Sequence, residues 1–305
     1  MKFDPSKIAS QMATISDGDV QVGKSLAPYT SYKIGGPTAV WVAPVSENSV
    51  GRVLDLIYRN EIPLFVLGRG SNVLISDRGW EGVTLYLGEN LSAVIFDRRD
   101  ARVLAGTLLL DLVRAAVKNG LAGMEQLAGI PGGIGGALRM NAGAFGNEIE
   151  STTREVNGFH RNGSPFHATR NDIQFNYRRV PELEDVTITS AVFRFEESDP
   201  HILSARMDDI LALRAKKQPL RYPSCGSVFK RPAGYYAGAM IEEAGLKAER
   251  IGGAMVSPQH AGFILNVDRA SAADVYALIN LIEKKVYDRF SVRLEREVRL
   301  IGEFD

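Results

Sequence analysis

Residues 130–146, IPGGIGGALRMNAGAFG, consist mostly of glycine and alanine and carry two large polar side chains, Arg139 and Asn141. Glycine loses more conformational entropy on folding than any other residue, so folding alone would not favour this composition. Glycine does allow the backbone to approach a ligand closely, and exposed N–H groups can then donate to an anion. The segment therefore predicts a place where main chain contacts a ligand.

A second glycine loop, GRGSNVLI at residues 68–75, follows an apolar run at 62–67 that predicts a buried strand. A Rossmann domain would need a third glycine where Val73 stands, and a helix where the sequence predicts a turn and a strand. No GK[ST] ending is present, which also argues against a P-loop. Gly68, Gly70, Ser71 and Asn72 could still offer N–H, hydroxyl and amide groups to phosphate oxygens.

Alone, the second loop could be a tight connector between strands. Two glycine loops in one chain favour another interpretation, in which both clamp one long ligand such as a dinucleotide.

Other kinds of chemistry are poorly supported by the composition. Cys225 is the only cysteine, which excludes an intrachain disulfide and a cysteine-rich metal site, and no histidine adjoins it to activate a nucleophile. The four histidines lack metal-ligand spacing, so we expect no metal. Lys plus Arg and Asp plus Glu each number 36, so no overall positive field favours nucleic acid.

The elements around the loops alternate between helices and strands. Helical periodicity follows Ser46, and further helices are expected over 108–119, closed by Gly120, over 201–217, and from a Ser271–Asp274 cap to Phe290. Short runs over 156–196 predict a mixed or antiparallel sheet, and the alternating residues 291–302 predict a last strand. The length fits two or three domains. Neither a signal peptide nor a membrane span is expected, so we predict a cytoplasmic protein.

Seven motifs in order give the chain a specific resemblance. It resembles the UDP-N-acetylenolpyruvoylglucosamine reductase family over nearly its whole length, through YTSYKIGG at 29–36, GRGSNVLI at 68–75, IPGGIGGALRMNAGAFG at 130–146, FNYR at 175–178, SCGSVFKRP at 224–232, IEEAGLKAERIGGAMVSPQHAGFILN at 241–266 and LEREVRLIG at 294–302.

The resemblance implies an α/β (α+β) fold. Its parts would be FAD-binding subdomains at 1–67 and 68–200, of the vanillyl-alcohol oxidase type, and an α+β substrate-binding domain at 201–305 whose last residues could return to the FAD-binding unit.

The resemblance also implies a reaction. NADPH would reduce FAD, and the reduced flavin would pass hydride to C3 of the enolpyruvyl group of UDP-N-acetylglucosamine enolpyruvate, giving UDP-N-acetylmuramate for peptidoglycan synthesis. Some proteins of this fold attach FAD covalently through a histidine in the phosphate loop, but residues 68–74 contain none, so non-covalent FAD is expected.

The implied cofactor-binding residues come from three motifs. They are Tyr32, Lys33, Ile34, Gly35 and Gly36; Gly68, Arg69, Gly70, Ser71 and Asn72; and Gly129, Pro131, Gly132, Gly135, Gly136, Arg139, Asn141 and Gly143.

Three residues match the family's catalytic positions. Hydride addition pushes negative charge into the substrate carboxylate, and the Arg178 guanidinium suits two carboxylate oxygens. Ser227 would protonate C2, and Glu297 would hydrogen-bond the developing enol carboxylate. From residue type and spacing alone, we would interpret Arg178 as a surface arginine, Ser227 as a turn residue and Glu297 as part of a solvated strand face. Glu295 is the alternative candidate for this third catalytic position, but the EVRLIG spacing favours Glu297.

Substrate contacts are implied for a further group: Tyr177, Lys230, Arg231, Lys247, His260 and Asn266. Many relatives carry Asn in place of Arg231, and His260 could equally be structural. The short path from FNYR to the next strand resembles the family type that lacks a tyrosine-bearing loop over the substrate.

Two alternatives remain open. The chain could be an FAD-dependent oxidase of the same fold that acts on a sugar or related alcohol, or a nucleotide-sugar-binding protein without catalysis. NADPH has no motif of its own, which fits alternate use of one site by NADPH and the sugar nucleotide. A monomer that binds neither nucleic acid nor membrane is expected.

Overall fold

The computed structural model describes residues 3–304, which form two compact units. The first unit contains residues 3–24, Ala39–Arg69 and Gly82–Arg214, and the second contains Ser25–Thr38, Gly70–Glu81 and residues 215–304. The chain therefore contributes two short early segments to the second unit. The predicted domain boundaries stay a prediction.

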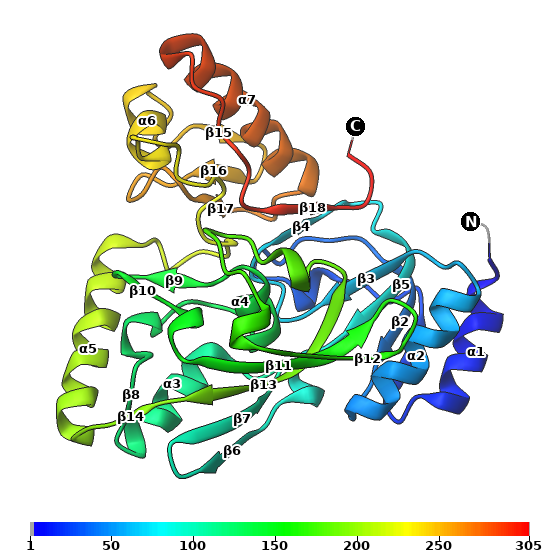
Figure 1. The fold of residues 1–305 in the computed structure, drawn as a ribbon. Helices are drawn as coiled ribbons and strands as arrows, with labels where there is room; N and C mark the ends of the chain where they lie inside the picture. The colour runs from blue at the N-terminus through cyan, green and yellow to red at the C-terminus, as the bar shows by residue number, and fades with distance from the viewer. Residues whose placement is uncertain (1–2, 305) are drawn as a thin grey trace. The chain divides into compact units, whose positions relative to one another are not determined.

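A four-stranded sheet in the order β1-β2-β5-β3 belongs to the first unit (Figure 1). Its elements are β1 Asp19–Val22, β2 Thr38–Ala43, β3 Leu64–Leu67 and β5 Trp80–Tyr86, with α1 Pro5–Ile15 and α2 Glu47–Arg59. The apolar positions of α2, including Val50, Val53 and Leu54, are fully buried with Val40 and Val83 of the sheet. The predicted helix after Ser46 and the strand within 62–67 are confirmed.

The first unit also contains an antiparallel sheet in the order β12-β11-β13-β7-β6. Its strands are β6 Val94–Asp97, β7 Asp100–Leu104, β11 Thr153–His160, β12 Pro165–Thr169 and β13 Val186–Arg194. The helices of this part are α3 Leu109–Lys118, α4 Ile134–Arg139 and α5 Pro200–Lys217, and two short strand pairs join β8 Leu121–Ala122 with β14 Glu196–Glu197 and β9 Gly143–Ala144 with β10 Asn147–Glu148. The predicted antiparallel region and the helix that Gly120 ends at φ 68° are confirmed.

The second unit has a small antiparallel sheet, β15-β16-β17, against which α7 packs (Figure 1). Its elements are β4 Val73–Ile75, α6 Ala237–Glu243, β15 Arg250–Ile251, β16 Ala254–Val256, β17 Ile264–Asn266, α7 Ala272–Phe290 and β18 Arg299–Ile301. Ser271 Oγ accepts from Asp274 N at 3.0 Å, and the Asp274 carboxylate accepts from Ser271 N at 3.0 Å. This reciprocal arrangement is the predicted cap of α7.

The last strand is shorter than the alternating sequence of 291–302 predicts. Only Arg299–Ile301 forms a strand, because its parallel partner β4 is equally short. Burial nevertheless alternates: Leu294 and Val298 are buried and Glu295 is exposed. The prediction of which face is buried is correct, whereas a continuous strand is wrong.

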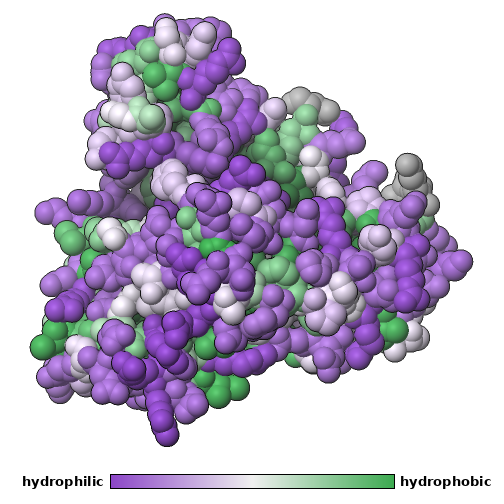
Figure 2. All heavy atoms as spheres, viewed as in Figure 1, coloured by the Kyte–Doolittle hydropathy of each residue, from purple (hydrophilic) through white to green (hydrophobic). Residues whose placement is uncertain are grey.

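The face in Figure 2 is mainly hydrophilic, with hydrophobic residues exposed in small groups. Among residues 3–304, no helix is long and apolar enough to cross a membrane.

Candidate functional site

The glycines around α4 divide into two classes. A Cβ on Gly133 would lie 2.9 Å from the Ala105 carbonyl oxygen, and one on Gly135 would lie 3.1 Å from Ala105 Cβ. A Cβ on Gly136 would meet no described heavy atom within 4 Å, and its φ lies outside the left-handed region. Gly68 has the same two properties. Packing among the described residues explains Gly133 and Gly135 but neither Gly68 nor Gly136.

The other glycines predicted to contact the cofactor in this unit have structural reasons. Gly129 has φ 78° and Gly132 has φ 120°, values that side chains rarely adopt. A Cβ on Gly143 would lie 2.7 Å from Glu148 Cγ.

Two arginines of the predicted cofactor set bind backbone carbonyls of the first unit. Arg139 donates from Nη1 to Glu184 O at 2.7 Å and from Nη2 to Val186 O at 2.9 Å. Arg69 donates from Nε to Gly106 O at 2.9 Å and pairs with Glu89 at 3.0 Å. Arg139 therefore connects α4 to the start of β13, and Arg69 connects its loop to Gly106 and Glu89.

Arg178 lies in a tight turn. Asn176 N donates to Arg179 O at 2.9 Å, and Arg179 N donates to Asn176 O at 3.2 Å, which leaves Tyr177 and Arg178 at the tip. The φ of Arg178 is 56°, a conformation that costs a residue with a side chain about 1–2 kcal/mol. Tyr177 is exposed, and the Arg178 guanidinium carbon lies 5.0 Å from its ring centroid. Such backbone strain is found preferentially at functional sites.

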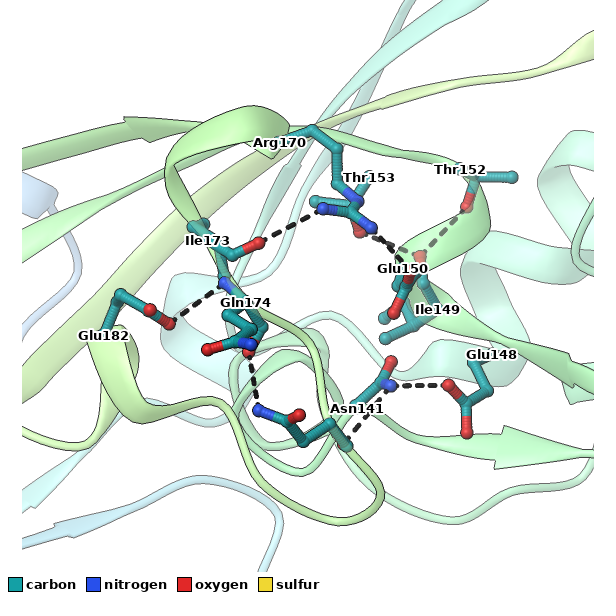
Figure 3. Close-up of polar contacts among 11 residues, drawn as sticks. Asn141, Glu148, Ile149, Glu150, Thr152, Thr153, Arg170, Ile173, Gln174 and Glu182 are labelled. Carbon is teal, nitrogen blue, oxygen red and sulfur yellow. Dashed lines mark hydrogen bonds and ion pairs between the residues drawn. The ribbon is translucent and has the colours of Figure 1, made fainter.

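Asn141 connects this turn to β10 (Figure 3). Its side chain is buried, and its Nδ2 donates to Glu148 Oε2 at 2.6 Å and to Asn176 O at 3.4 Å. Sequence reasoning missed Glu148. The Phe145-Gly146 turn could have indicated it, because a two-residue hairpin there places Glu148 opposite Gly143.

Beside Arg170, a cavity of about 390 Å³ is lined by Arg170, Asn171, Asp172, Ile173, Gln174, Phe175 and Glu182. Arg170 pairs with Glu150 and donates to Ile173 O, and Glu182 accepts from Gln174 N (Figure 3). These bonds brace the loop that leads to Tyr177 and Arg178.

In the second unit, residues 32–36 pack against residues 70–79. A Cβ on Gly36 would lie 2.2 Å from Asp77 O, and one on Gly70 would lie 2.1 Å from Tyr29 O. Gly35 has φ 145° and Gly70 has φ 63°. Lys33, at φ 59°, donates from Nζ to Pro28 O. Close backbone packing thus explains Gly36 and Gly70, and the φ value explains Gly35.

The same unit brings Tyr32, Ile34 and Asn72 into contact with later parts of the chain. Tyr32 and Ile34 are buried in its core. Asn72 Nδ2 donates to Glu297 O at 3.1 Å, and Asn72 O accepts from Arg299 N at 3.1 Å. Ser71, next to Asn72, is half-buried.

Ser227 and Glu297 lie on neighbouring segments of the second unit. Ser227 forms an antiparallel bridge with Phe263, and the next residue, Val228, accepts from Glu297 N at 2.8 Å through its carbonyl. Ser227 and Glu297 are both half-buried. The preceding residue, Gly226, has φ 81°, so the turn before the serine needs glycine. Two of the three predicted catalytic residues are therefore held by one backbone network.

Cys225, two residues before Ser227, is a buried free thiol. Burial raises its pKa to about 12; the Tyr32 hydroxyl opposes that rise, and the Glu297 carboxylate adds to it. Burial also raises the pKa of Tyr32 well above its ordinary value. The thiol is therefore protonated at neutral pH, which agrees with the absence of an adjoining histidine that could activate it as a nucleophile.

The three predicted basic substrate residues of the second unit each have a partner. Lys230 pairs with Glu295, and Lys247 pairs with Glu242 at 2.6 Å. The Arg231 guanidinium carbon lies 4.0 Å from the Tyr236 ring centroid. Glu295 is exposed and paired with Lys230, whereas Glu297 is half-buried. The surroundings of the two glutamates therefore differ.

His260 and Asn266 make hydrogen bonds to main chain. Gly262 N donates to His260 Nδ1 at 3.1 Å, and burial lowers the pKa of this histidine, so its neutral form is favoured. Asn266 donates to Tyr32 O at 2.9 Å and accepts from Ala270 N at 2.8 Å. Both side chains stabilise this unit locally.

Among residues 3–304, no group of three or more His, Cys, Asp or Glu could hold a metal ion.

The predicted site residues divide between the two units. Ser227, Glu297 and Asn72 belong to the second unit, and Arg178, Asn141 and Gly136 belong to the first.

Comparisons with known proteins cover both units. Residues 218–301 match the UDP-N-acetylenolpyruvoylglucosamine reductase C-terminal domain, and residues 38–163 match an FAD binding domain. UDP-N-acetylenolpyruvoylglucosamine reductase from Clostridium novyi is 40% identical over 276 residues, 90% of each chain. Its namesake from Lactobacillus johnsonii is 42% identical over 288 residues, 93% of this chain and 95% of the relative.

A crystal structure of UDP-N-acetylenolpyruvylglucosamine reductase from Thermus caldophilus has a TM-score of 0.80 at 32% identity, covering 93% of this chain and 99% of the other. The predicted fold class, an FAD-binding unit followed by an α+β C-terminal domain, is confirmed by these matches. Identity of this degree over nine-tenths of the sequence establishes that the chain belongs to the UDP-N-acetylenolpyruvoylglucosamine reductase family.

Proposed function

We propose that this chain reduces UDP-N-acetylglucosamine enolpyruvate to UDP-N-acetylmuramate, with FAD as cofactor and NADPH as hydride donor, in peptidoglycan precursor synthesis. The observation that carries the proposal is the identity of about 40% over nine-tenths of the chain with proteins of that name. The function would serve cell wall biogenesis and, through it, cell shape and division.

The residues of the structure fit a flavin dinucleotide. Gly68 and Gly136 each leave open the space that a Cβ would fill, and neither needs glycine for its φ. Bare backbone of this kind is what close approach of a cofactor requires. We propose that Gly68, Arg69, Gly70, Ser71 and Asn72, residues 32–36, and the predicted positions of 129–143 hold FAD without a covalent bond.

When bound, the flavin would supply a hydride to C3 of the enolpyruvyl group after reduction by NADPH. Negative charge then develops on C2 and on the substrate carboxylate. We assign Arg178 to the carboxylate oxygens, because a guanidinium donates two parallel hydrogen bonds to a carboxylate and stays charged. The strained φ of Arg178 supports this assignment.

The remaining steps belong to the second unit. We assign Ser227 as the proton donor to C2 and Glu297 as the partner of the developing enol carboxylate. Two observations support these roles. Ser227 and Glu297 are both half-buried, and a backbone hydrogen bond from Glu297 N to Val228 O joins their segments. Tyr177, Lys230, Arg231, Lys247, His260 and Asn266 are proposed substrate contacts. Residues 179–185 alone join Arg178 to β13, which supports a substrate entrance without a covering tyrosine loop.

We also propose that the protein acts as a cytoplasmic monomer on a small nucleotide sugar, without nucleic acid or membrane partners. Domain boundaries at 67/68 and 200/201 are part of the same proposal.

An anaerobic spectrum tests the function. The visible flavin band should bleach with NADPH and return with UDP-N-acetylglucosamine enolpyruvate. A band that only air restores would favour an FAD-dependent oxidase, and failure to bind FAD would refute both interpretations.

The role of Ser227 has its own test. Replacing Ser227 by Ala should spare flavin reduction by NADPH and slow flavin reoxidation by the enolpyruvyl substrate about 100-fold to 10,000-fold, the range for a lost general acid. Ser164→Ala, in the exposed β11–β12 turn, is the control. Normal turnover in Ser227→Ala would disprove the assignment.

A further inference from the structure

The β9–β10 hairpin carries Glu148 to one side of the Arg178 turn. Phe145 and Gly146, with φ 52° and 79°, form its two-residue tip, which is the geometry of a type I′ turn. The register pairs Glu148 with Gly143. A Cβ on Gly143 would lie 2.7 Å from Glu148 Cγ, so the glutamate side chain folds across this glycine.

Asn141 joins that glutamate to the turn. It is completely buried and has φ 40°, a left-handed conformation that Asn tolerates better than most residues. Its Nδ2 donates a short, charge-assisted hydrogen bond to Glu148 Oε2 at 2.6 Å and a longer one to Asn176 O at 3.4 Å (Figure 3). Asn176 is the first residue of the turn that presents Arg178.

Arg178 closes the loop of contacts. Its Nη2 donates at 3.5 Å to the carbonyl oxygen of Gly143, the glycine across which the Glu148 side chain folds. The turn is thus attached at two points: Asn176 O is bound by Asn141, which donates to Glu148 of the hairpin, and the Arg178 side chain donates to Gly143 O of the hairpin. A shift of Glu148 would move both attachments.

We propose that Asn141 and Glu148 are positioning residues that orient Arg178 toward the substrate carboxylate. This rests on the proposed function, because it concerns the carboxylate contact assigned to Arg178. The Asn141 side chain is completely buried, and both hydrogen bonds of its Nδ2 run to Glu148 and to the turn, which supports action on Arg178 through the turn. The carboxylate of Glu148 fixes the Asn141 amide, and the amide fixes the turn.

The test measures flavin reoxidation by the enolpyruvyl substrate in the holoenzyme. Glu148→Ala should slow it about 10-fold to 100-fold, and more than it slows flavin reduction by NADPH. Glu148→Gln keeps an acceptor oxygen and should restore most of the rate. The control Glu184→Ala, which removes the ion pair with Arg179 at the same turn, should change the rate less than about twofold.

A double-mutant cycle separates positioning from loss of structure. In an Arg178→Ala background, Glu148→Ala should lower the reoxidation rate by less than about twofold, because the group it positions is gone. Multiplicative losses in the double variant would overturn the proposal, as would an unchanged rate in Glu148→Ala alone.

A second variant keeps the test independent of the stability of Glu148→Ala. Asn141→Asp places the new carboxyl group within hydrogen-bond distance of the Glu148 carboxyl group. The two negative charges repel at pH 8, so flavin reoxidation should be slow there. As the pH falls and one carboxyl group is protonated, the rate should recover relative to wild type. A wild-type rate at every pH would refute positioning. Failure of the wild-type enzyme to be reoxidised by substrate would instead refute the proposed function.

Discussion

Gly136→Ala tests why this chain uses so much bare backbone. A methyl group at this position meets no described atom within 4 Å, and its φ suits an L-residue. Alanine in a helix is more stable than glycine by roughly 0.5–1 kcal/mol, because less backbone entropy is lost on folding. The variant should therefore stabilise the FAD-free protein by about that amount, which raises Tm by roughly 1–2 °C for a chain of this length.

The effect on FAD should have the opposite sign. If the cofactor uses the open space at Gly136, the added methyl group must displace it, and overpacking of a close contact costs about 1–3 kcal/mol. FAD affinity should therefore fall by about fivefold to 150-fold, because about 1.4 kcal/mol corresponds to a tenfold change. Titration of FAD-free protein with FAD, followed by flavin fluorescence, measures this change.

Gly135→Ala is the matched control one residue earlier. Its Cβ would lie 3.1 Å from Ala105 Cβ, tighter than an ordinary contact, so this variant should be less stable than Gly136→Ala. If Gly136→Ala gains stability and binds FAD as tightly as wild type, the open space is not a cofactor contact, and the argument from Gly136 is refuted.

Three further predictions concern the second unit. Gly70→Ala should destabilise the protein by more than about 1 kcal/mol, because its φ is 63° and its Cβ would lie 2.1 Å from Tyr29 O; a urea midpoint equal to wild type would contradict the packing. Ser271→Ala should cost about 1 kcal/mol through the lost cap of α7, measured in the same way, with Ser10→Ala at an exposed position of α1 as reference. Cys225 has a folded pKa of about 12 against an ordinary 9.0, so its contribution is complete below pH 9 and is lost as the pH rises toward 12, by up to about 1.4 kcal/mol per unit. Cys225→Ala should remove that part of the alkaline slope, and an unchanged slope would show that the thiol does not cause it.

Local chemistry made the helices predictable. The Ser271–Asp274 cap, the glycine after α3 and the 3.6-residue spacing of Val50, Val53 and Leu54 each act within a few residues, so the sequence displays them directly. Alternation over 291–302 predicts too long a last strand, because alternation reports which side chains are buried, whereas strand length depends on the partner strand. β4, more than 200 residues earlier in the chain, offers only three residues for pairing.

The Arg178 turn shows what the pattern could not give. Only its motif identifies Arg178 in the sequence. Its positive φ and its connection to Glu148 through Asn141 arise in the folded chain, where segments about 35 residues apart come together. A hydrogen-bond loop of this kind has no spacing rule, because its members meet only after the hairpin and the turn have formed.

Glycine count is likewise a weak signal, because one residue type serves two physical purposes. Gly36 and Gly70 permit backbone segments to touch, so they would be required with or without a ligand. A Cβ built on Gly68 or Gly136 would meet no described atom within 4 Å, so packing within the protein does not require glycine there. Contact with a ligand would require it. The geometric support for a bound dinucleotide therefore comes from these two positions, whereas substitutions at Gly36 or Gly70 would disturb the fold as well as any contact with FAD.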